Sequence, residues 1–240
     1  MDQYKAVFFD LGGTLRIADQ DQDHIRKARD RMAELAGYEN PQAFIEMIEA
    51  RYVPYRDWAL SENLEAGDYE LWKKWLLPEL DDEIIRKICH EITYQYRQYK
   101  GLRHVVEGGV EVIRTLHDRG YKLGIISNLI GENEIYDWLK DDGLDVYFDA
   151  VVLSSVTHIR KPDPRMYLMA CQQLGLDPSE CVNVADNIKR DFTGAKKAGI
   201  GLNVMYIAPD KLKTRKLTKD NYPDYIVHRF TDILDLPELQ

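Results

Sequence analysis

Several apolar runs in this chain end in polar residues that could act together on an anionic group. The run "AVFF" is followed by Asp10, the run "KLGII" by Ser127 and Asn128, and the run "CVNVA" by Asp186. A carboxylate can bind a hard cation or attack an electrophile, and hydroxyl and amide groups donate hydrogen bonds to anions. Lys161, in the segment "RKPDP", adds a positive charge. A lysine and a divalent cation together would allow a carboxylate to approach a phosphate group.

These residues need a scaffold that brings the ends of several strands together. Runs rich in Val, Ile and Phe predict buried strands at 5–10, 122–128, 150–154, 181–186 and 202–207. Amphipathic stretches that end at glycine predict helices at 108–120, 163–175 and 190–199. The alternation of strand and helix from residue 102 onward predicts a Rossmann-like, doubly wound α/β fold with a parallel sheet. In such folds reactive groups gather at the carboxyl ends of the strands.

Residues 16–101 interrupt this alternation. They contain no convincing strand, and spacings such as Ile84, Ile88 and Ile92 predict about four successive helices. We therefore expect a helical cap at 16–101, inserted into a core formed by 1–15 and 102–240. Aromatic residues at helical spacing are expected in the interior of the cap rather than in a substrate pocket. They are Trp58, Trp72, Trp75, Tyr94 and Tyr99.

Composition argues against several kinds of partner. The chain has 240 residues, enough for one substantial core. Its formal net charge of -9 argues against nucleic acid as a partner, because binding to nucleic acid normally requires a basic face. The 3 cysteines show no CxxC spacing, which suggests neither a disulfide framework nor a thiolate zinc site. No apolar run has the length of a membrane span or a signal peptide. We expect a cytoplasmic protein without nucleic-acid or membrane partners, whose oligomeric state the sequence does not reveal.

Taken together and in order, four segments resemble the motifs of the haloacid dehalogenase-like (HAD) hydrolases. They are "FFDLGGTL", "IISN", "RKPDP" and "VADNIKRDFTGAKKAG". The resemblance extends over the whole chain, and it implies that Asp10 is a nucleophile that forms an aspartyl phosphate. Ser127 and the backbone of Asn128 would hold the transferring phosphoryl group, and Lys161 would neutralise charge between nucleophile and phosphate. Thr14 would complete the set of donors around the anion.

The resemblance also implies a Mg²⁺ cofactor. Asp10 and Asp186 would supply carboxylate ligands and Gly12 a main-chain carbonyl, with Asp191 in support. Oxygen ligands of this kind suit magnesium rather than zinc. The implied activity is a magnesium-dependent phosphatase acting on a small phosphorylated molecule.

Gly12 departs from the family's DxDGT motif. The second aspartate of that motif protonates the leaving oxygen and later activates the attacking water, which glycine cannot do. A positioned acid or base contributes about 10²–10⁴-fold to a rate. We therefore expect slow turnover, substitution by Arg16, Asp19 or His24, or a preference for good leaving groups such as acyl and aryl phosphates.

Other readings follow from the same glycine. One is a catalytically silent module that binds a phosphate ligand or a protein. Another is a halide- or phosphonate-cleaving enzyme. Halide cleavage goes with a bulky aromatic residue at this position and no metal, and phosphonate cleavage with a lysine of the cap. The cap lysines to consider are Lys27, Lys73, Lys74 and Lys87.

Overall fold

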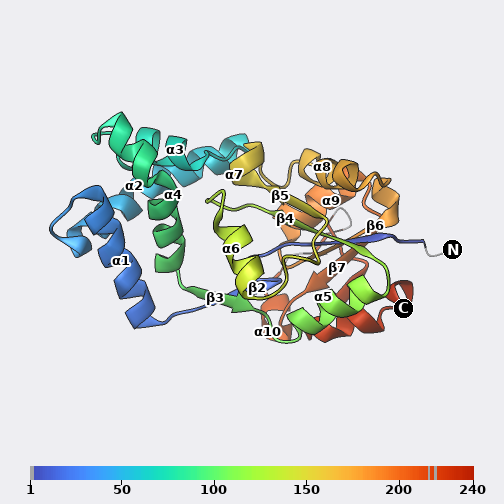
Figure 1. The fold of residues 1–240 in the computed structure, drawn as a ribbon. Coiled ribbons are helices and arrows are strands. Elements are labelled where there is room, and N and C mark those ends of the chain that lie inside the picture. Colours follow the sequence, from blue (N-terminus) through green and yellow to red (C-terminus); the bar gives the residue numbers. More distant parts are fainter. Residues whose placement is uncertain (1–2, 216, 219–220) are drawn as a thin grey trace.

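The structure is a computed structural model, and it describes residues 3–215, 217–218 and 221–240. Its centre is a six-stranded sheet of order β5-β4-β1-β6-β7-β8 in which every neighbouring pair is parallel (Figure 1). The strands are β1 (Ala6–Phe9), β4 (Lys122–Ser127), β5 (Ala150–Leu153), β6 (Cys181–Ala185), β7 (Leu202–Tyr206) and β8 (Tyr225–Val227). The predicted Rossmann-like α/β fold and its five predicted strands are confirmed. The sequence reasoning missed only the short edge strand β8 of this sheet.

Helices cover both faces of the sheet. They are α5 (Gly109–Asp118), α6 (Glu134–Asp141), α7 (Ser154–Thr157), α8 (Arg165–Leu174), α9 (Thr193–Ala198) and α10 (Pro209–Leu212), with short helical turns η2 (Pro178–Glu180), η3 (Ile188–Phe192), η4 (Phe230–Asp235) and η5 (Pro237–Leu239). Side chains alternate along β1, so Val7 and Phe9 pack with residues of α5 and η4, and Ala6 and Phe8 with residues of α8 and α9. Figure 1 shows α5 and α8 on opposite sides of the sheet.

A second group of helices lies beyond the carboxyl ends of the strands (Figure 1). It consists of α1 (Gln22–Ala36), α2 (Pro41–Glu62), α3 (Asp68–Glu70), η1 (Leu71–Leu76) and α4 (Asp82–Tyr99). These helices share one apolar cluster, in which Trp72 is fully buried and donates a hydrogen bond from Nε1 to Thr93 Oγ1 at 2.7 Å. Trp58, Trp75 and Tyr99 pack against the same cluster, as expected. For Tyr94 the expectation is wrong, because this residue is 38% exposed.

Two strands connect the helical group to the sheet. β2 (Arg16–Asp19) pairs antiparallel with β3 (Leu102–Val105), and Figure 1 shows this ribbon between the cap helices and the central sheet. The expectation that 16–101 contains no strand is therefore wrong. β2 is short and half exposed, so its residues show no apolar alternation. Its partner strand is far away in the sequence, since Arg16 pairs with Val105 and Asp19 with Leu102. The predicted limits of core and cap, 1–15 with 102–240 and 16–101, stay a prediction.

Two further features bear on the composition. None of the helices in the described ranges is long and apolar enough to cross a membrane. The cysteines are free and buried, and Cys171 and Cys181 lie with their sulfur atoms 3.8 Å apart.

Candidate active site

Strand register brings the predicted motif residues to one edge of the sheet. Phe9 of β1 lies opposite Ile125 of β4 and Val184 of β6. Asp10 therefore leaves the sheet between Ser127, the last residue of β4, and Asp186, which follows β6. The Asp10 backbone N–H donates to the carbonyl of Val184 at 3.0 Å, which fixes the start of this loop against β6.

Asp10 is buried beside a lysine. Its side chain is 2% exposed, and Lys161 Nζ donates to Asp10 Oδ1 at 2.7 Å. The same ammonium group donates to the carbonyl of Ile126 at 2.6 Å and pairs with Asp191 Oδ1 at 2.6 Å. One buried lysine thus serves two carboxylates, and removal of this lysine would leave both buried carboxylates without their shared partner.

The loop that carries Lys161 is held by Asn128. Asn128 Nδ2 donates to the Lys161 carbonyl at 2.9 Å, and the Lys161 backbone N–H donates to Asn128 Oδ1 at 2.7 Å. The Asn128 side chain thus positions Lys161, a role that the sequence reasoning did not foresee. The predicted contact of its backbone with phosphate stays a prediction.

Two hydroxyl groups predicted to contact phosphate are also buried near strand ends. Ser127 is 3% exposed, and Thr14 is fully buried in the loop after β1. Thr14 Oγ1 has no hydrogen-bond partner in the structure. A buried polar atom is normally paired, so the Thr14 hydroxyl retains an unused capacity for a hydrogen bond.

Arg190 belongs to the same cluster, and the sequence reasoning missed it. One of its guanidinium nitrogens, Nη2, lies 3.2 Å from Asp10 Oδ2 and 3.6 Å from both Asp186 Oδ1 and Asp191 Oδ2. Burial acts to lower the pKa of Arg190, but Asp191, Asp10 and Asp186 raise it above its usual value overall. The available signal was its spacing, because Arg190 follows Asp186 by four residues and directly precedes Asp191 in a helical turn.

The acidic residues form a set that fits a divalent cation. Asp10, Asp186 and Asp191 each offer an oxygen, and these atoms lie within 4.8 Å of one another. Asp186 Oδ1 is buried without a hydrogen-bond partner and lies 3.6 Å from Arg190 Nη2, whereas Asp191 Oδ1 is paired with Lys161 Nζ. Burial, followed by the charges of Asp10 and Asp191, raises the pKa of Asp186 to about 6. Carboxylate oxygens are the donors that Mg²⁺ prefers, so these residues fit the predicted cofactor.

The glycines after Asp10 differ in their surroundings. A Cβ atom on Gly13, whose φ is +88°, would lie 2.7 Å from Asp186 Oδ2. Gly13 thus allows the loop to approach the acidic cluster closely. At Gly12, by contrast, an added Cβ would meet no atom within 4 Å. The position where the family motif has its second aspartate therefore has space for a side chain. Metal binding by the Gly12 carbonyl stays a prediction.

The residues proposed from sequence to replace that aspartate are engaged elsewhere. The Arg16 guanidinium lies over the Trp138 ring at 4.0 Å and donates to a backbone carbonyl at 2.7 Å. Asp19 pairs with His104 at 3.4 Å, and His24 Nε2 lies 3.1 Å from Gln98 Oε1. None of these contacts involves Asp10.

The cap lysines likewise contact groups of the cap itself. Lys27 pairs with Asp23 at 2.7 Å, Lys74 pairs with Glu70 at 2.6 Å, and Lys73 Nζ donates to the carbonyl of Leu80 at 2.7 Å. Lys87 is exposed. A lysine-dependent phosphonate chemistry gains no support from these positions.

A buried glutamate, which the sequence reasoning also missed, connects the Lys161 loop to the helical group. Glu65 accepts hydrogen bonds from Tyr55 of α2 and from Ser154 of α7, the latter at 2.9 Å, and it pairs with Arg160. Its side chain is fully buried. Because Arg160 precedes Lys161, the Lys161 loop is held by the helical group as well as by Asn128.

Fold and site together define a class of protein. A parallel α/β sheet here presents a buried aspartate, a lysine and a cluster of carboxylates at the carboxyl ends of its strands. Residues 4–199 match the family model of haloacid dehalogenase-like hydrolases. The chain belongs to this family.

Its relatives include enzymes that act on phosphate compounds. The chain is 31% identical to pyrophosphatase PpaX of Halalkalibacterium halodurans over 66% of this chain and 75% of that protein. It is 27% identical to glyceraldehyde 3-phosphate phosphatase of Pyrococcus furiosus over 99% of this chain and 95% of that protein.

Solved structures share the fold. A HAD phosphatase from Thermococcus onnurineus aligns with a TM-score of 0.59 and 24% identity over 96% of both chains. A 2-haloacid dehalogenase from Pseudomonas syringae pv. Tomato aligns with a TM-score of 0.65 and 20% identity over 97% of both chains.

Proposed function

We propose that this protein is a magnesium-dependent phosphatase that acts on a small phosphorylated molecule through Asp10. The observation that carries the proposal is the burial of Asp10 between Lys161 and Arg190, within a set of carboxylates suited to a divalent cation. Two relatives, a pyrophosphatase and a glyceraldehyde 3-phosphate phosphatase, act on phosphate compounds by name. Both support phosphate as the group transferred.

In the proposed reaction an Asp10 carboxylate oxygen attacks phosphorus. A bond forms between that oxygen and phosphorus, the bond to the leaving oxygen breaks, and its electron pair departs with the leaving group. Water then attacks phosphorus in the aspartyl phosphate, and the bond between phosphorus and the Asp10 oxygen breaks. Its electron pair returns to the Asp10 carboxylate, the proton of the water passes to solvent, and inorganic phosphate leaves. Lys161 and Arg190 offset the negative charge that gathers at Asp10, and Thr14 and Ser127 donate hydrogen bonds to the phosphoryl oxygens.

Asp10, Asp186 and Asp191 would hold the cofactor in this proposal. When bound, Mg²⁺ would supply positive charge that reduces the repulsion between the Asp10 carboxylate and the phosphate oxygens. Asp191, predicted only in a supporting role, is proposed here as a full member of the ligand set because its oxygen lies with those of Asp10 and Asp186.

Gly12 sets the expected substrate preference. Glycine has no carboxylic acid, so the leaving oxygen does not receive the proton that the second aspartate of the family motif would donate. Substrates whose leaving groups are stable anions need the least protonation, and they include aryl phosphates, acyl phosphates and pyrophosphate. We therefore propose good leaving groups as the preferred substrate class.

The test is phosphate release from a panel of aryl, acyl and alkyl phosphates and pyrophosphate with Mg²⁺, for the wild type and Asp10→Asn. We expect release by the wild type, loss with EDTA and loss in Asp10→Asn. Asp118→Asn is the control, because its side chain is 80% exposed and lies in α5. Phosphate release unchanged in Asp10→Asn would refute the role of Asp10. No release from any substrate would instead favour the silent phosphate- or protein-binding module.

A further inference from the structure

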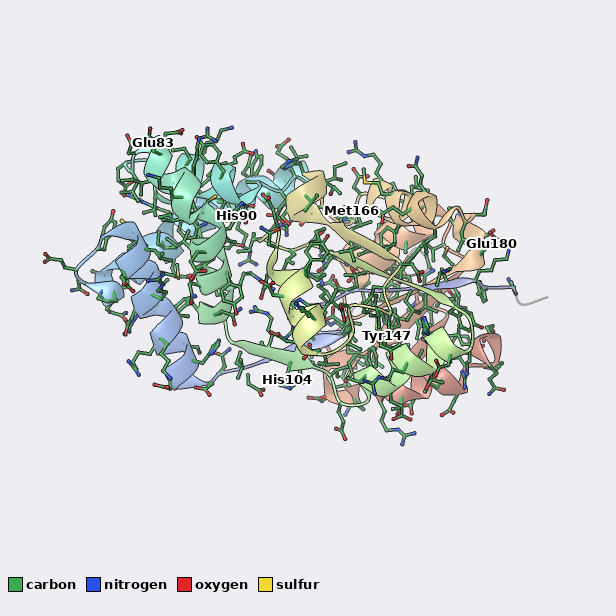
Figure 2. All side chains as sticks on the ribbon, viewed as in Figure 1. Glu83, His90, His104, Tyr147, Met166 and Glu180 are labelled. Carbon is green, nitrogen blue, oxygen red and sulfur yellow. The ribbon has the colours of Figure 1, made fainter. Side chains whose placement is uncertain are left out.

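A second group of potential ligands lies away from Asp10, where the cap helices meet the loop after β4. Asp68 begins α3, His90 lies in α4, and Glu132 lies between β4 and α6. One ligand atom from each lies within 4.8 Å of the other two. His90 Nδ1 is 2.7 Å from Asp68 Oδ2, and the Asp68 backbone N–H donates to Glu132 Oε1 at 2.8 Å. Figure 2 labels His90 on α4.

Asp68 gives this cluster a feature that surface acidic groups lack. Its side chain is only 3% exposed, yet its Oδ1 atom has no hydrogen-bond partner. Asp68, His90 and Glu132 line a cavity of about 190 Å³, which has room for an ion and water. A cation would remove the cost of this buried, incompletely paired carboxylate.

The charges around the cavity favour a cation. Its wall also includes Glu91, Glu134 and Asp137. Arg97 pairs with Glu134 at 2.8 Å and Arg31 approaches Glu91 at 3.8 Å. Among the described residues, neither Glu132 nor Asp137 has a lysine or arginine partner within ion-pair distance. The cavity therefore keeps an excess of negative charge.

We propose that Asp68, His90 and Glu132 bind a divalent transition-metal cation of the Zn²⁺ type. Imidazole nitrogen combined with carboxylate oxygen is a donor set that zinc accepts, whereas magnesium prefers oxygen alone. Bonds of about 2.0–2.2 Å place neighbouring ligand atoms roughly 3–4 Å apart, so the observed spacing needs only small side-chain shifts. The exposed His90 side chain, at 56%, is free to make such a shift.

The position of this site gives the cation a structural consequence. Two ligands come from the cap helices and Glu132 comes from the loop that follows β4, the strand that ends in Ser127. A bound cation would tie these two parts of the molecule together. The proposal does not depend on the proposed phosphatase activity, because it uses none of the residues around Asp10.

The test is a calorimetric titration with Zn²⁺ in the presence of excess Mg²⁺, at about pH 7.5, where an ordinary histidine is neutral. We expect His90→Ala and Glu132→Gln each to lower the Zn²⁺ affinity of the Asp68 site by about tenfold or more. The matched control is His104→Ala (Figure 2), since His104 is 46% exposed and pairs with a single carboxylate, Asp19, at 3.4 Å. The Asp10 cluster is intact in every variant and contributes equally to each titration.

Thermal unfolding gives a second readout. Zn²⁺ should raise the unfolding midpoint of the wild type and of His104→Ala more than that of His90→Ala, because a ligand that binds only the folded state stabilises it. Circular dichroism checks that the variants fold. If His90→Ala does not fold, Glu132→Gln still tests the site, because it keeps the oxygen that accepts the hydrogen bond from the Asp68 N–H. Identical Zn²⁺ titrations for the wild type, His90→Ala and Glu132→Gln would overturn the proposal. An equal loss in His104→Ala would overturn it as well.

Discussion

Replacing Gly12 by aspartate should increase phosphatase activity, most strongly toward alkyl phosphates. The loop has space for the new side chain, because a Cβ atom at position 12 would meet no other atom within 4 Å. Gly12 is not among the glycines with positive φ, so an L-residue fits its backbone. Replacement of such a glycine restricts the unfolded chain and so favours folding, whereas repulsion from the neighbouring carboxylates opposes folding at neutral pH.

The size of the increase follows from acid and base catalysis. A positioned acid or base contributes about 10²–10⁴-fold, which corresponds to roughly 2.7–5.4 kcal/mol in the activation free energy. The new carboxyl group would join Asp10, Asp186 and Asp191, whose negative charges Lys161 and Arg190 only partly offset. Like charges raise a carboxyl pKa, which favours the protonated form that a leaving oxygen needs.

The assay compares steady-state phosphate release from 4-nitrophenyl phosphate and glycerol phosphate. We expect an increase in kcat/KM of about 10²-fold or more for glycerol phosphate and a smaller one for the aryl ester, whose leaving group needs less protonation. Gly12→Asn is the matched control, because it has nearly the same shape and no titratable proton. A folded Gly12→Asp variant without any increase, or an equal increase in Gly12→Asn, would refute the reasoning.

Three further predictions concern charge and stability. Arg190→Ala should strengthen Mg²⁺ binding several-fold in calorimetry. The Arg190 guanidinium lies 3.2–3.6 Å from oxygens of three carboxylates, so its positive charge opposes the binding of a cation there. Unchanged or weaker binding would contradict this prediction. The pKa of Asp186 is raised to about 6, so its contribution to the stability of the metal-free protein should be lost as pH rises from about 4 to 6. Asp186→Asn should therefore be more stable than the wild type at neutral pH by roughly 3 kcal/mol in urea unfolding with EDTA, and the difference should shrink toward pH 4. Equal stability of the two proteins at neutral pH would count against the raised pKa. Glu65→Ala should reduce the free energy of unfolding by about 3–5 kcal/mol, because it leaves Arg160 without its buried partner. The control Glu34→Ala removes an exposed carboxylate and should change the free energy of unfolding little. Similar losses in the two variants would show that the buried pair is not the cause.

Local patterns in the sequence were sufficient to predict the α/β fold. The strands around Asp10, Ser127 and Asp186 are buried on both faces, so their apolar runs are recognisable without knowledge of their partners. β2 was missed because its pairing with β3, rather than its own residues, makes it a strand. The carboxyl ends of parallel strands meet at one edge, and this rule alone predicted that Asp10 and Asp186 would be neighbours.

The sequence by itself determined which residue types stand at the strand ends and that glycine occupies position 12. Only the tertiary structure decided how these groups are paired. In the folded protein Arg190 lies against three carboxylates, and the Asn128 side chain accepts a hydrogen bond from the Lys161 backbone. Glu132 lies beside Asp68. These contacts depend on side-chain directions and on residues far apart in the chain. Sequence patterns do not encode the pairs that span separate elements, such as Asp10 with Arg190 and Asp68 with Glu132, because these pairs arise only when the elements pack together.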